Sequence, residues 1–317
     1  MRVAIVHYHL KRGGVTRVIQ SAVSALKDHT ELLVITGDAD NSMLDCPVRE
    51  IPELQYCEDY SPDTPARLAK AIQAAARDFF GGNPDLWHVH NHSLGKNVHF
   101  PEALKQILDS GARLFLQMHD FAEDGRPVSY ESLKKFHKNP RSDTFAKTLY
   151  PQAPQVHYGV LNGRDYGFLK NAGWQKDQLH WIPNAVTPPA NPQNSVVRKN
   201  HWNQQFGNLP LVLYPTRGIR RKNIGELALL ALIHRNRKAF ATTLFPDNPV
   251  WQTRHNEWQR WCSRNRLPIS FGVASNTSLT FESLLAGAEV LINTSIAEGF
   301  GLAFLEPWLI GKSVRGR

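Results

Sequence analysis

The sequence predicts an α/β fold made of two successive blocks in which strands and helices alternate. Short apolar runs rich in Val, Ile and Leu alternate with segments of helical periodicity through residues 1–186. The same alternation starts again near residue 211. A proline-rich stretch at residues 187–192, which cannot hold a regular element, separates the two blocks. Since strands separated by helices form parallel sheets covered on both faces, we expect two α/β domains, residues 1–186 and 187–317.

The first block opens on an apolar run, Val3–Tyr8, that predicts a strand. Gly13-Gly14 ends the loop after it, and apolar residues at helical spacing from Val15 to Leu26 predict the first helix. An Ala-rich helix over Pro65–Phe80 stops at glycines and a proline. Further strands are expected at Leu32–Thr36, Leu86–His90, Arg113–Met118 and Val156–Leu161, and further helices near Pro101–Asp109 and Arg164–Asn171.

The second block repeats the pattern on a smaller scale. Its expected strands are Leu211–Pro215, Ala241–Phe245, Ile269–Gly272 and Val290–Asn293, and its expected helices are Ile224–Arg235, Thr253–Arg264 and Thr280–Ala286. A further helix carries Glu306, after which the sequence stops just as another strand begins. We therefore expect the second domain to be incomplete.

The composition is that of a globular protein with a full core, because 42% of the 317 residues are hydrophobic and 21% are charged. No apolar run approaches the ~20 residues that span a bilayer. The N-terminus lacks the apolar region and cleavage site of a signal peptide. The three cysteines, Cys46, Cys57 and Cys262, are scattered and show no CxxC spacing. A cytoplasmic setting without disulfides is therefore expected.

The net charge of +9 lies entirely in the second block. Residues 1–186 hold 21 basic and 21 acidic side chains, whereas residues 187–317 hold 16 basic and 7 acidic ones. This asymmetry suits a domain that holds a phosphorylated ligand. It also suits a polyanion-binding module or peripheral attachment to an anionic membrane. Because the cations form no long run with interleaved aromatics, we expect no nucleic-acid partner, while peripheral membrane association stays open.

Two carboxylates flank a glycine-rich bend near the end of the chain. Glu298 precedes Gly299-Phe300-Gly301, and Glu306 lies on the helix that follows. The glycines let the backbone approach a ligand, and the new helix N-terminus favours anions. Carboxylates do not bind phosphate without a metal, so their natural partners here are hydroxyls. A site that collects a phosphate and several hydroxyls describes a nucleotide sugar.

A cluster of cations follows the first strand of the second block, at Arg217-Gly218-Ile219-Arg220-Arg221-Lys222-Asn223. Asn223 is expected to cap the next helix, so the cations stand at its positive end. A diphosphate would relieve their repulsion, with lysine acting as a point charge and arginine as a bidentate fork. The alternative is a solvated basic loop.

Seven residues, which include Gly-Phe-Gly, separate Glu298 from Glu306. This pair resembles the paired-glutamate signature of retaining glycosyltransferases of the GT-B fold, specifically family 4 (group 1). Ile182–Val186 also matches the family's interdomain element, and Arg217 and Lys222 match its diphosphate-binding pair. The resemblance implies two Rossmann-like domains facing across a cleft, the first on the acceptor side and the second holding the nucleotide sugar. Family members continue beyond the point where this chain stops, so a C-terminal truncation and a catalytically impaired, nucleotide-binding fragment are also considered.

The resemblance implies carbohydrate biosynthesis by sugar transfer from a nucleotide-diphosphate sugar to a carbohydrate or other hydroxyl acceptor, with no metal or other cofactor. Arg217 and Lys222 would stabilise the leaving diphosphate. Glu298 would hold the hydroxyls of the donor sugar and Glu306 the ribose, with Gly299, Phe300 and Gly301 beside them. With His119, these residues make up the expected catalytic and donor-binding set.

In the first domain the resemblance assigns a donor-facing loop to Gly13 and Gly14 and a contact near the reacting carbon to His119. The Gly-Gly pair is not a GxGxxG fingerprint, so a dinucleotide site is poorly supported. His119-Asp120 follows a predicted strand at the end where α/β sheets build their sites. The residues expected on the acceptor side are His90, Asn91, Lys96 and Asp120, and Glu123 and Asp124 lie in the same loop as Asp120 and are further candidates for an acceptor contact.

His88-Val89-His90 supports a competing hypothesis, because alternating histidines on a strand project to one face and can hold a metal. Together with His119 they would make a metal-dependent hydrolase. A strand buried on both faces hides imidazoles, however, and no further ligand cluster follows. We therefore favour the transferase.

Overall fold

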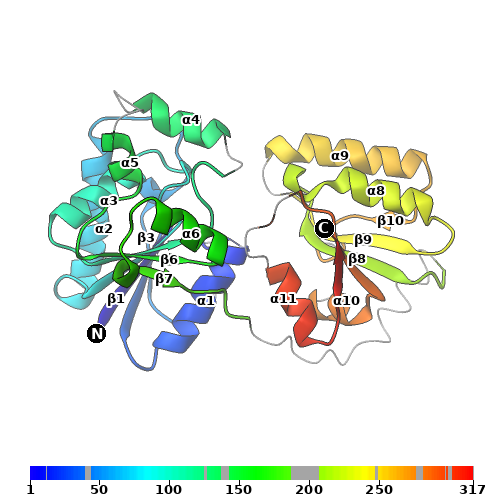
Figure 1. Cartoon of the computed structure of the whole chain (residues 1–317), viewed down its shortest axis with the longest axis horizontal. Helices are drawn as coiled ribbons and strands as arrows, with labels where there is room; N and C mark the ends of the chain where they lie inside the picture. The colour runs from blue at the N-terminus through cyan, green and yellow to red at the C-terminus, as the bar shows by residue number, and fades with distance from the viewer. Residues whose placement is uncertain are drawn as a thin grey trace. The chain divides into compact units, whose positions relative to one another are not determined.

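The computed structural model describes residues 1–11, 13–39, 44–124, 127–136, 143–186, 207–246, 249–275, 281–296, 298 and 302–316. The chain divides into two compact units, Met1–Ala185 and Val186–Arg317. We call them the N-terminal and the C-terminal unit. Each contains a parallel sheet with helices on both faces, as the alternation of the sequence predicted (Figure 1). The proline-rich residues 187–192 lie outside the described residues.

The N-terminal unit holds a seven-stranded sheet in the order β3-β2-β1-β4-β5-β6-β7, with every neighbouring pair parallel. Its strands are β1 (Arg2–His7), β2 (Glu31–Thr36), β3 (Val48–Glu50), β4 (Leu86–His90), β5 (Leu114–Met118), β6 (Val156–Val160) and β7 (Leu179–Trp181). Its helices are α1 (Gly14–Leu26), α2 (Thr64–Phe80), α3 (Phe100–Asp109), α4 (Pro127–Phe136), α5 (Asp143–Leu149) and α6 (Gly163–Asn171), with 3₁₀ turns η1 (Pro52–Leu54) and η2 (Lys176–Gln178).

Strand β1 explains why the core of this unit reads as continuous apolar runs. Ala4 and Val6 pack into a cluster with α2 and α3, whereas Val3 and Ile5 pack into a second cluster with α1. All four side chains are buried. A central parallel strand contacts helices on both faces, so neither set of alternate residues can be polar.

The C-terminal unit holds a five-stranded parallel sheet in the order β10-β9-β8-β11-β12. Its strands are β8 (Leu211–Arg217), β9 (Ala239–Leu244), β10 (Ile269–Ser270), β11 (Val290–Asn293) and β12 (Val314–Gly316). Its helices are α8 (Ile224–Ile233), α9 (Pro249–Arg264), α10 (Phe281–Gly287) and α11 (Leu302–Leu309), with the 3₁₀ turn η3 (Arg220–Lys222). Leu211 and Leu213 pack with α10, while Val212 and Tyr214 pack with α8 on the opposite face.

The elements that sequence reasoning missed are short or polar. Strands β3 and β7 have three residues each and lie at the two edges of the sheet. An edge strand of this length buries too little to show an apolar run, and α4 and α5 were not predicted either. Strand β12 is the strand that the sequence predicts to begin at the end of the chain. Among the helices that the structure describes, none has both the length and the apolar character needed to cross a bilayer.

Candidate functional site

In both sheets the strand order reverses beside the first strand of the unit. The N-terminal chain runs outward from β1 through β2 to β3 and then returns to β4 on the other side of β1. The C-terminal chain runs from β8 through β9 to β10 and returns to β11. Connections leaving the carboxyl ends of the two flanking strands diverge, and α/β proteins bind ligands in the crevice between them. Most of the predicted site residues that the structure describes lie at or after the carboxyl ends of β1, β4, β8 and β11.

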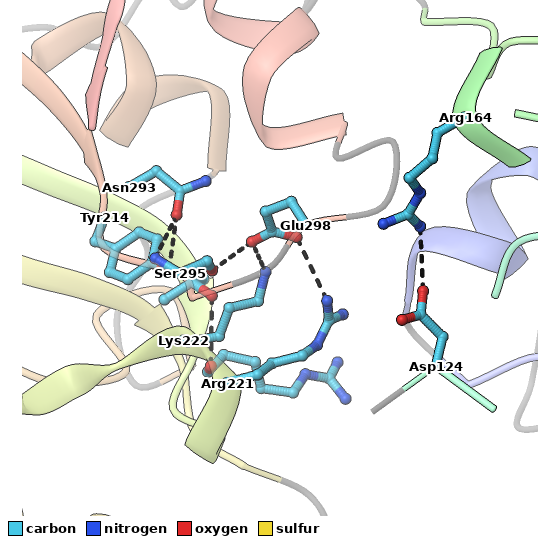
Figure 2. Close-up of polar contacts among 10 residues, drawn as sticks. Asp124, Arg164, Tyr214, Arg221, Lys222, Asn293, Ser295 and Glu298 are labelled. Atoms are coloured by element: carbon cyan, nitrogen blue, oxygen red, sulfur yellow. Dashed lines mark hydrogen bonds and ion pairs between the residues drawn. The ribbon is translucent and has the colours of Figure 1, made fainter. Parts of the chain in front are cut away.

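The crevice of the C-terminal unit holds a cluster of ion pairs after β8 and β11. Lys222 Nζ donates a hydrogen bond to Glu298 Oε1, and the guanidinium of Arg221 lies 3.6 Å from Glu298 Oε2 (Figure 2). The side chains of Lys222 and Glu298 are only 13% and 12% exposed. They are 76 residues apart in the sequence and meet because β8 pairs with β11. The structure thus joins two predicted residues and adds Arg221.

Backbone and side-chain hydrogen bonds tie the two connections together. Thr294 Oγ1 donates to the carbonyl oxygens of Lys222, at 3.0 Å, and Asn223, at 3.2 Å. The backbone N–H of Ile296 donates to the carbonyl oxygen of Arg221 at 2.9 Å. The cations therefore stand on a backbone that is fixed from both strands, so their positions are set before a ligand arrives.

A buried polar network fixes Ser295 beside Glu298. Asn293 Oδ1 accepts the backbone N–H of Ser295 at 2.7 Å and the hydroxyl of Tyr214 at 3.1 Å (Figure 2). Ser295 Oγ lies 2.7 Å from the Tyr214 hydroxyl and donates to Glu298 Oε1 at 2.5 Å. Because an ionised carboxylate only accepts, the Ser295 proton points to Glu298, and the Tyr214 proton is divided between Asn293 and Ser295.

These partners keep Glu298 ionised in a partly buried place. Burial alone raises the pKa of this carboxyl group, but the charge of Lys222 and the hydrogen bonds from Lys222 and Ser295 outweigh it. Arg221 contributes in the same direction. The net result is a pKa below the ordinary value of a glutamate, so the crevice holds a carboxylate together with two cations at neutral pH.

The other residues predicted on the C-terminal side have different surroundings. Arg217 is the last residue of β8 and is half-buried. Gly218 follows it, and a Cβ atom there would lie 2.0 Å from Cδ2 of His255, so only glycine fits beside this ring. Glu306 is buried within α11, on the predicted helix after the bend. Gly299, Phe300 and Gly301 lie outside the described residues.

The prediction that Asn223 is the N-cap of the next helix is confirmed for its position but not for a capping hydrogen bond. Asn223 stands at the N-cap position of α8, but its backbone is left-handed, with φ of 49°, and its side chain makes no capping hydrogen bond. Its Nδ2 donates instead to Glu226 at 2.7 Å. A capping oxygen needs an extended backbone at this position, and the preceding turn η3 does not leave one.

The crevice of the N-terminal unit is built from histidines. His90, at the end of β4, has its ring 4.3 Å from that of His88 and 5.2 Å from that of His119, centroid to centroid. His90 Nδ1 and His119 Nε2 share a hydrogen bond of 2.9 Å. His88 Nε2 lies 2.8 Å from Gln117 Oε1, and since an amide oxygen only accepts, this nitrogen carries the proton. The structure therefore brings together two predicted residues, His90 and His119.

All of these imidazoles are uncharged at neutral pH. Burial lowers the pKa of His88 to about 4 and that of His119 to about 3. Burial, followed by repulsion from the neighbouring imidazoles, places the pKa of His90 well below its ordinary value. At the end of β1, burial and the neighbouring His9 lower the pKa of His7 to about 3. The cluster offers neutral ring nitrogens, which can donate or accept hydrogen bonds without adding charge.

Asn91 holds the backbone that carries His119. Its Oδ1 accepts the backbone N–H of His119 at 2.7 Å and that of Asp120 at 3.3 Å. Asn91 itself is buried and left-handed, with φ of 54°, a conformation that asparagine tolerates better than most residues. The geometry gives this side chain a positioning role. Its predicted contact with an acceptor stays a prediction.

The remaining residues predicted in this unit follow the carboxyl ends of β1, β4 and β5. Lys96 is half-buried, with Nζ 5.2 Å from the centre of the Tyr56 ring, and Asp120 is half-buried next to His119. Gly13 and Gly14 start helix α1. A Cβ atom on Gly14 would meet no described atom within 4 Å, so the space beside this turn is open to a ligand.

The competing metal site gains no support. Within the described ranges, no group of three or more His, Cys, Asp or Glu side chains is arranged to hold a metal ion. His90 and His119 share their facing nitrogens with each other, and His88 uses Nε2 for Gln117. The three histidines thus form a stacked row instead of pointing to one centre.

Three functional residues escaped sequence reasoning. Arg221 is one of three consecutive cations, and nothing in their order tells which of them turns toward Glu298. Tyr214 lies within a strand and reads as a core aromatic. Ser295 lies in the turn after β11, and its position three residues before Glu298 was the only available signal.

Comparison with known proteins supplies a relative but no family model, since none matches the chain. The mannosylglucosyl-3-phosphoglycerate synthase of Petrotoga mobilis is 26% identical over 327 aligned residues. The alignment covers 95% of this chain but 62% of that protein, so the chain spans less than two thirds of the length of the relative.

Solved structures match over nearly the whole chain. HepE of Anabaena, in complex with UDP-glucose, is 15% identical and superposes with a TM-score of 0.71, covering 100% of this chain and 80% of HepE. A glycosyltransferase from Rickettsia africae is 17% identical, with a TM-score of 0.65, covering 99% of this chain and 78% of that one. At such identities the match establishes the fold: the chain has the α/β fold of the GT-B glycosyltransferases.

Proposed function

We propose that this protein transfers a sugar from a nucleotide-diphosphate sugar to an acceptor hydroxyl, with retention of configuration, as in family 4. The observation that carries the proposal is the cluster of Lys222, Arg221 and Glu298 at the switch point of the C-terminal sheet. The comparisons agree with it, because HepE binds UDP-glucose and the Petrotoga relative is a synthase of a sugar-containing product.

The cluster suggests how a donor would be held. Glu298 now neutralises Lys222, and a diphosphate would compete with it for this ammonium and for Arg221. The displaced carboxylate would then be available to the hydroxyls of the donor sugar. Charge builds on the diphosphate as the sugar leaves, and cations already fixed at that place stabilise it without reorganisation. Arg217 and Glu306 complete the proposed donor set, with Glu306 on the ribose.

In the N-terminal unit we assign the donor sugar to His119, with the open turn at Gly13 and Gly14 nearby in the donor-binding set. His119 is 8% exposed, and its Nε2 is bonded to His90. A neutral imidazole can position a hydroxyl without attracting the diphosphate.

A thermal-shift screen of UDP, ADP and GDP tests the proposal. We expect one diphosphate to raise the melting temperature, since saturation at 100 times Kd adds about 2.7 kcal/mol of stability. Lys222→Ala and Arg217→Ala should abolish the shift. Glu298→Gln should keep it or increase it, because the competing carboxylate is gone.

Lys238→Ala is the matched control, since Lys238 lies in the same unit but pairs with Glu289 at the surface. It should leave the shift unchanged. A folded protein whose melting temperature responds to none of the three diphosphates would remove the basis of the proposal.

A further inference from the structure

The N-terminal unit contains a hollow of about 330 Å³, and its lining includes Glu123 and Asp124 of the loop that follows His119. Its volume is within the range of small-molecule pockets. Three segments form it: the connection after β5, the residue that follows α5, and helix α6 with the residues just after it. The lining residues are Phe121, Glu123, Asp124, Tyr150, Phe168, Leu169, Ala172 and Trp174.

Two of the aromatic walls of the hollow, Tyr150 and Trp174, are held in place by neighbouring residues. The Tyr150 hydroxyl donates to Glu123 Oε2 at 2.6 Å and accepts the backbone N–H of Ala122 at 3.3 Å. Trp174 packs edge-on against Tyr158, with ring centroids 5.2 Å apart. Phe168, by contrast, is 55% exposed, so one wall presents an aromatic face to solvent. Fixed rings that stay exposed provide flat apolar surface at little entropic cost.

The rim of the hollow carries both signs of charge. Asp124 Oδ2 lies 3.1 Å from the guanidinium of Arg164 (Figure 2). Arg164 also pairs with Asp165 at 2.9 Å. The same guanidinium lies 5.7 Å from the centre of the Phe168 ring. An anionic ligand would be opposed by Glu123 and Asp124, and a cationic one by Arg164. A neutral molecule with several hydroxyls avoids both penalties, because each hydroxyl donates to a carboxylate or accepts from a guanidinium.

The hollow lies next to the histidine crevice. Phe121 is two residues after His119, so their Cα atoms are within about 7 Å of each other. We propose that this hollow binds the acceptor and that the acceptor is a neutral saccharide, whose apolar ring face packs on Phe168 and Trp174 while its hydroxyls bond to Glu123 and Asp124. The inference rests on the proposed function, since it names the chemical class of the acceptor.

Saturation-transfer NMR with methyl α-D-glucopyranoside as the probe tests the site directly, without turnover. We expect binding to the wild-type protein and about tenfold weaker binding to Phe168→Ala, the loss of one aromatic contact. Phe168→Tyr should restore binding. Trp308→Ala removes a ring that is 62% exposed in the C-terminal unit and should change nothing. Because Phe168 is half exposed, the alanine variant should fold, which its melting temperature will confirm.

Tetramethylammonium and inorganic phosphate serve as charged probes of the same hollow. If either binds in a Phe168-dependent way while the glucoside does not, the proposal is overturned. Equal binding of the glucoside to wild type and Phe168→Ala overturns it as well. The diphosphate shift separates the two proposals: a shift without glucoside binding rejects only the acceptor hollow, whereas glucoside binding without a shift rejects the transferase, and with it the acceptor role, but keeps the saccharide site.

Discussion

The two crevices of this protein have the same topology but opposite electrostatics. Each lies at the carboxyl ends of strands that flank a reversal of strand order. The N-terminal crevice buries imidazoles and keeps them neutral, whereas the C-terminal crevice buries a carboxylate and keeps it charged. The pKa values of both kinds of group are lowered, but by different causes: desolvation acts on the histidines, and cations act on Glu298.

The comparison teaches that burial has different consequences in the two units. An imidazole leaves water by giving up its proton, so the histidine row needs no counter-ion. A carboxylate whose proton is lost needs partners, and Glu298 has Lys222, Arg221 and Ser295. The first arrangement is therefore sensitive to acid, and the second to the removal of a partner.

The largest expected effect is acid destabilisation of the N-terminal unit. Six buried histidines of this unit have lowered pKa values: His7, His88, His90, His92, His99 and His119. Below their unfolded pKa of about 6.5, the unfolded chain binds protons that the folded chain does not. The free energy of unfolding is therefore highest above pH 6.5. Toward pH 4 it falls by up to about 1.4 kcal/mol per histidine and pH unit.

Urea unfolding between pH 7.5 and pH 4.5, followed by hydrogen exchange to separate the units, measures this loss. The C-terminal unit should resist longer, because the contribution of Glu298 is lost only as the pH falls below its ordinary pKa of about 4.5. In addition, His255 is the only histidine with a lowered pKa in the described part of this unit. His88→Gln should make the slope shallower. A stability that does not change over this range, or earlier loss of the C-terminal unit, would contradict the neutral histidine row.

The next largest effect is expected from Lys222→Met, which leaves Glu298 buried beside a single, more distant cation. Breaking a buried pair on one side costs about 3 kcal/mol, so the free energy of unfolding should fall by that order. The double variant Lys222→Met, Glu298→Gln should recover most of the loss. Lys238→Met, which breaks the exposed pair with Glu289, should cost less than about 1 kcal/mol. Equal losses for the two lysines would show that the ion pair of Lys222 with Glu298 contributes no more to stability than the exposed pair of Lys238 with Glu289.

The smallest effect compares two left-handed asparagines, one beside each crevice. Asn91→Gly keeps the backbone conformation but removes the oxygen that accepts the N–H groups of His119 and Asp120, at a cost of about 1–2 kcal/mol. Asn223→Gly removes only the contact with Glu226 and should change stability by about 0.5 kcal/mol or less. Chemical denaturation of both variants measures the difference. A larger loss at Asn223 would reverse the ranking.

The alternation of apolar runs was enough to predict both parallel sheets, because a central strand such as β1 is apolar on both faces. It was not enough for β3 and β7, whose three residues at the sheet edges bury little. Helix limits shifted by a few residues where no strong breaker marks them, as at the start of α9.

For the candidate site, motif spacing pointed to Lys222 and Glu298, but their contact depends on the pairing of β8 with β11. Strand order is a property of the whole unit, and no local pattern states it. The same limit explains why Arg221 was not told apart from Arg220, and why the aromatic hollow was not foreseen. Its rings, at positions 121, 150, 168 and 174, come from different segments and are scattered singly along the sequence.

The sequence separation of Lys222 and Glu298 also bears on how the protein is made. Both partners are present only after β9, β10 and their helices have been synthesised and β11 has docked against β8. A nascent chain that ends before residue 298 contains Lys222 but not its partner Glu298. Pairings between residues this far apart in the sequence form late in folding. Capture of the proposed nucleotide would therefore report that β11 has docked against β8, and it could not help the earlier strands to find their places.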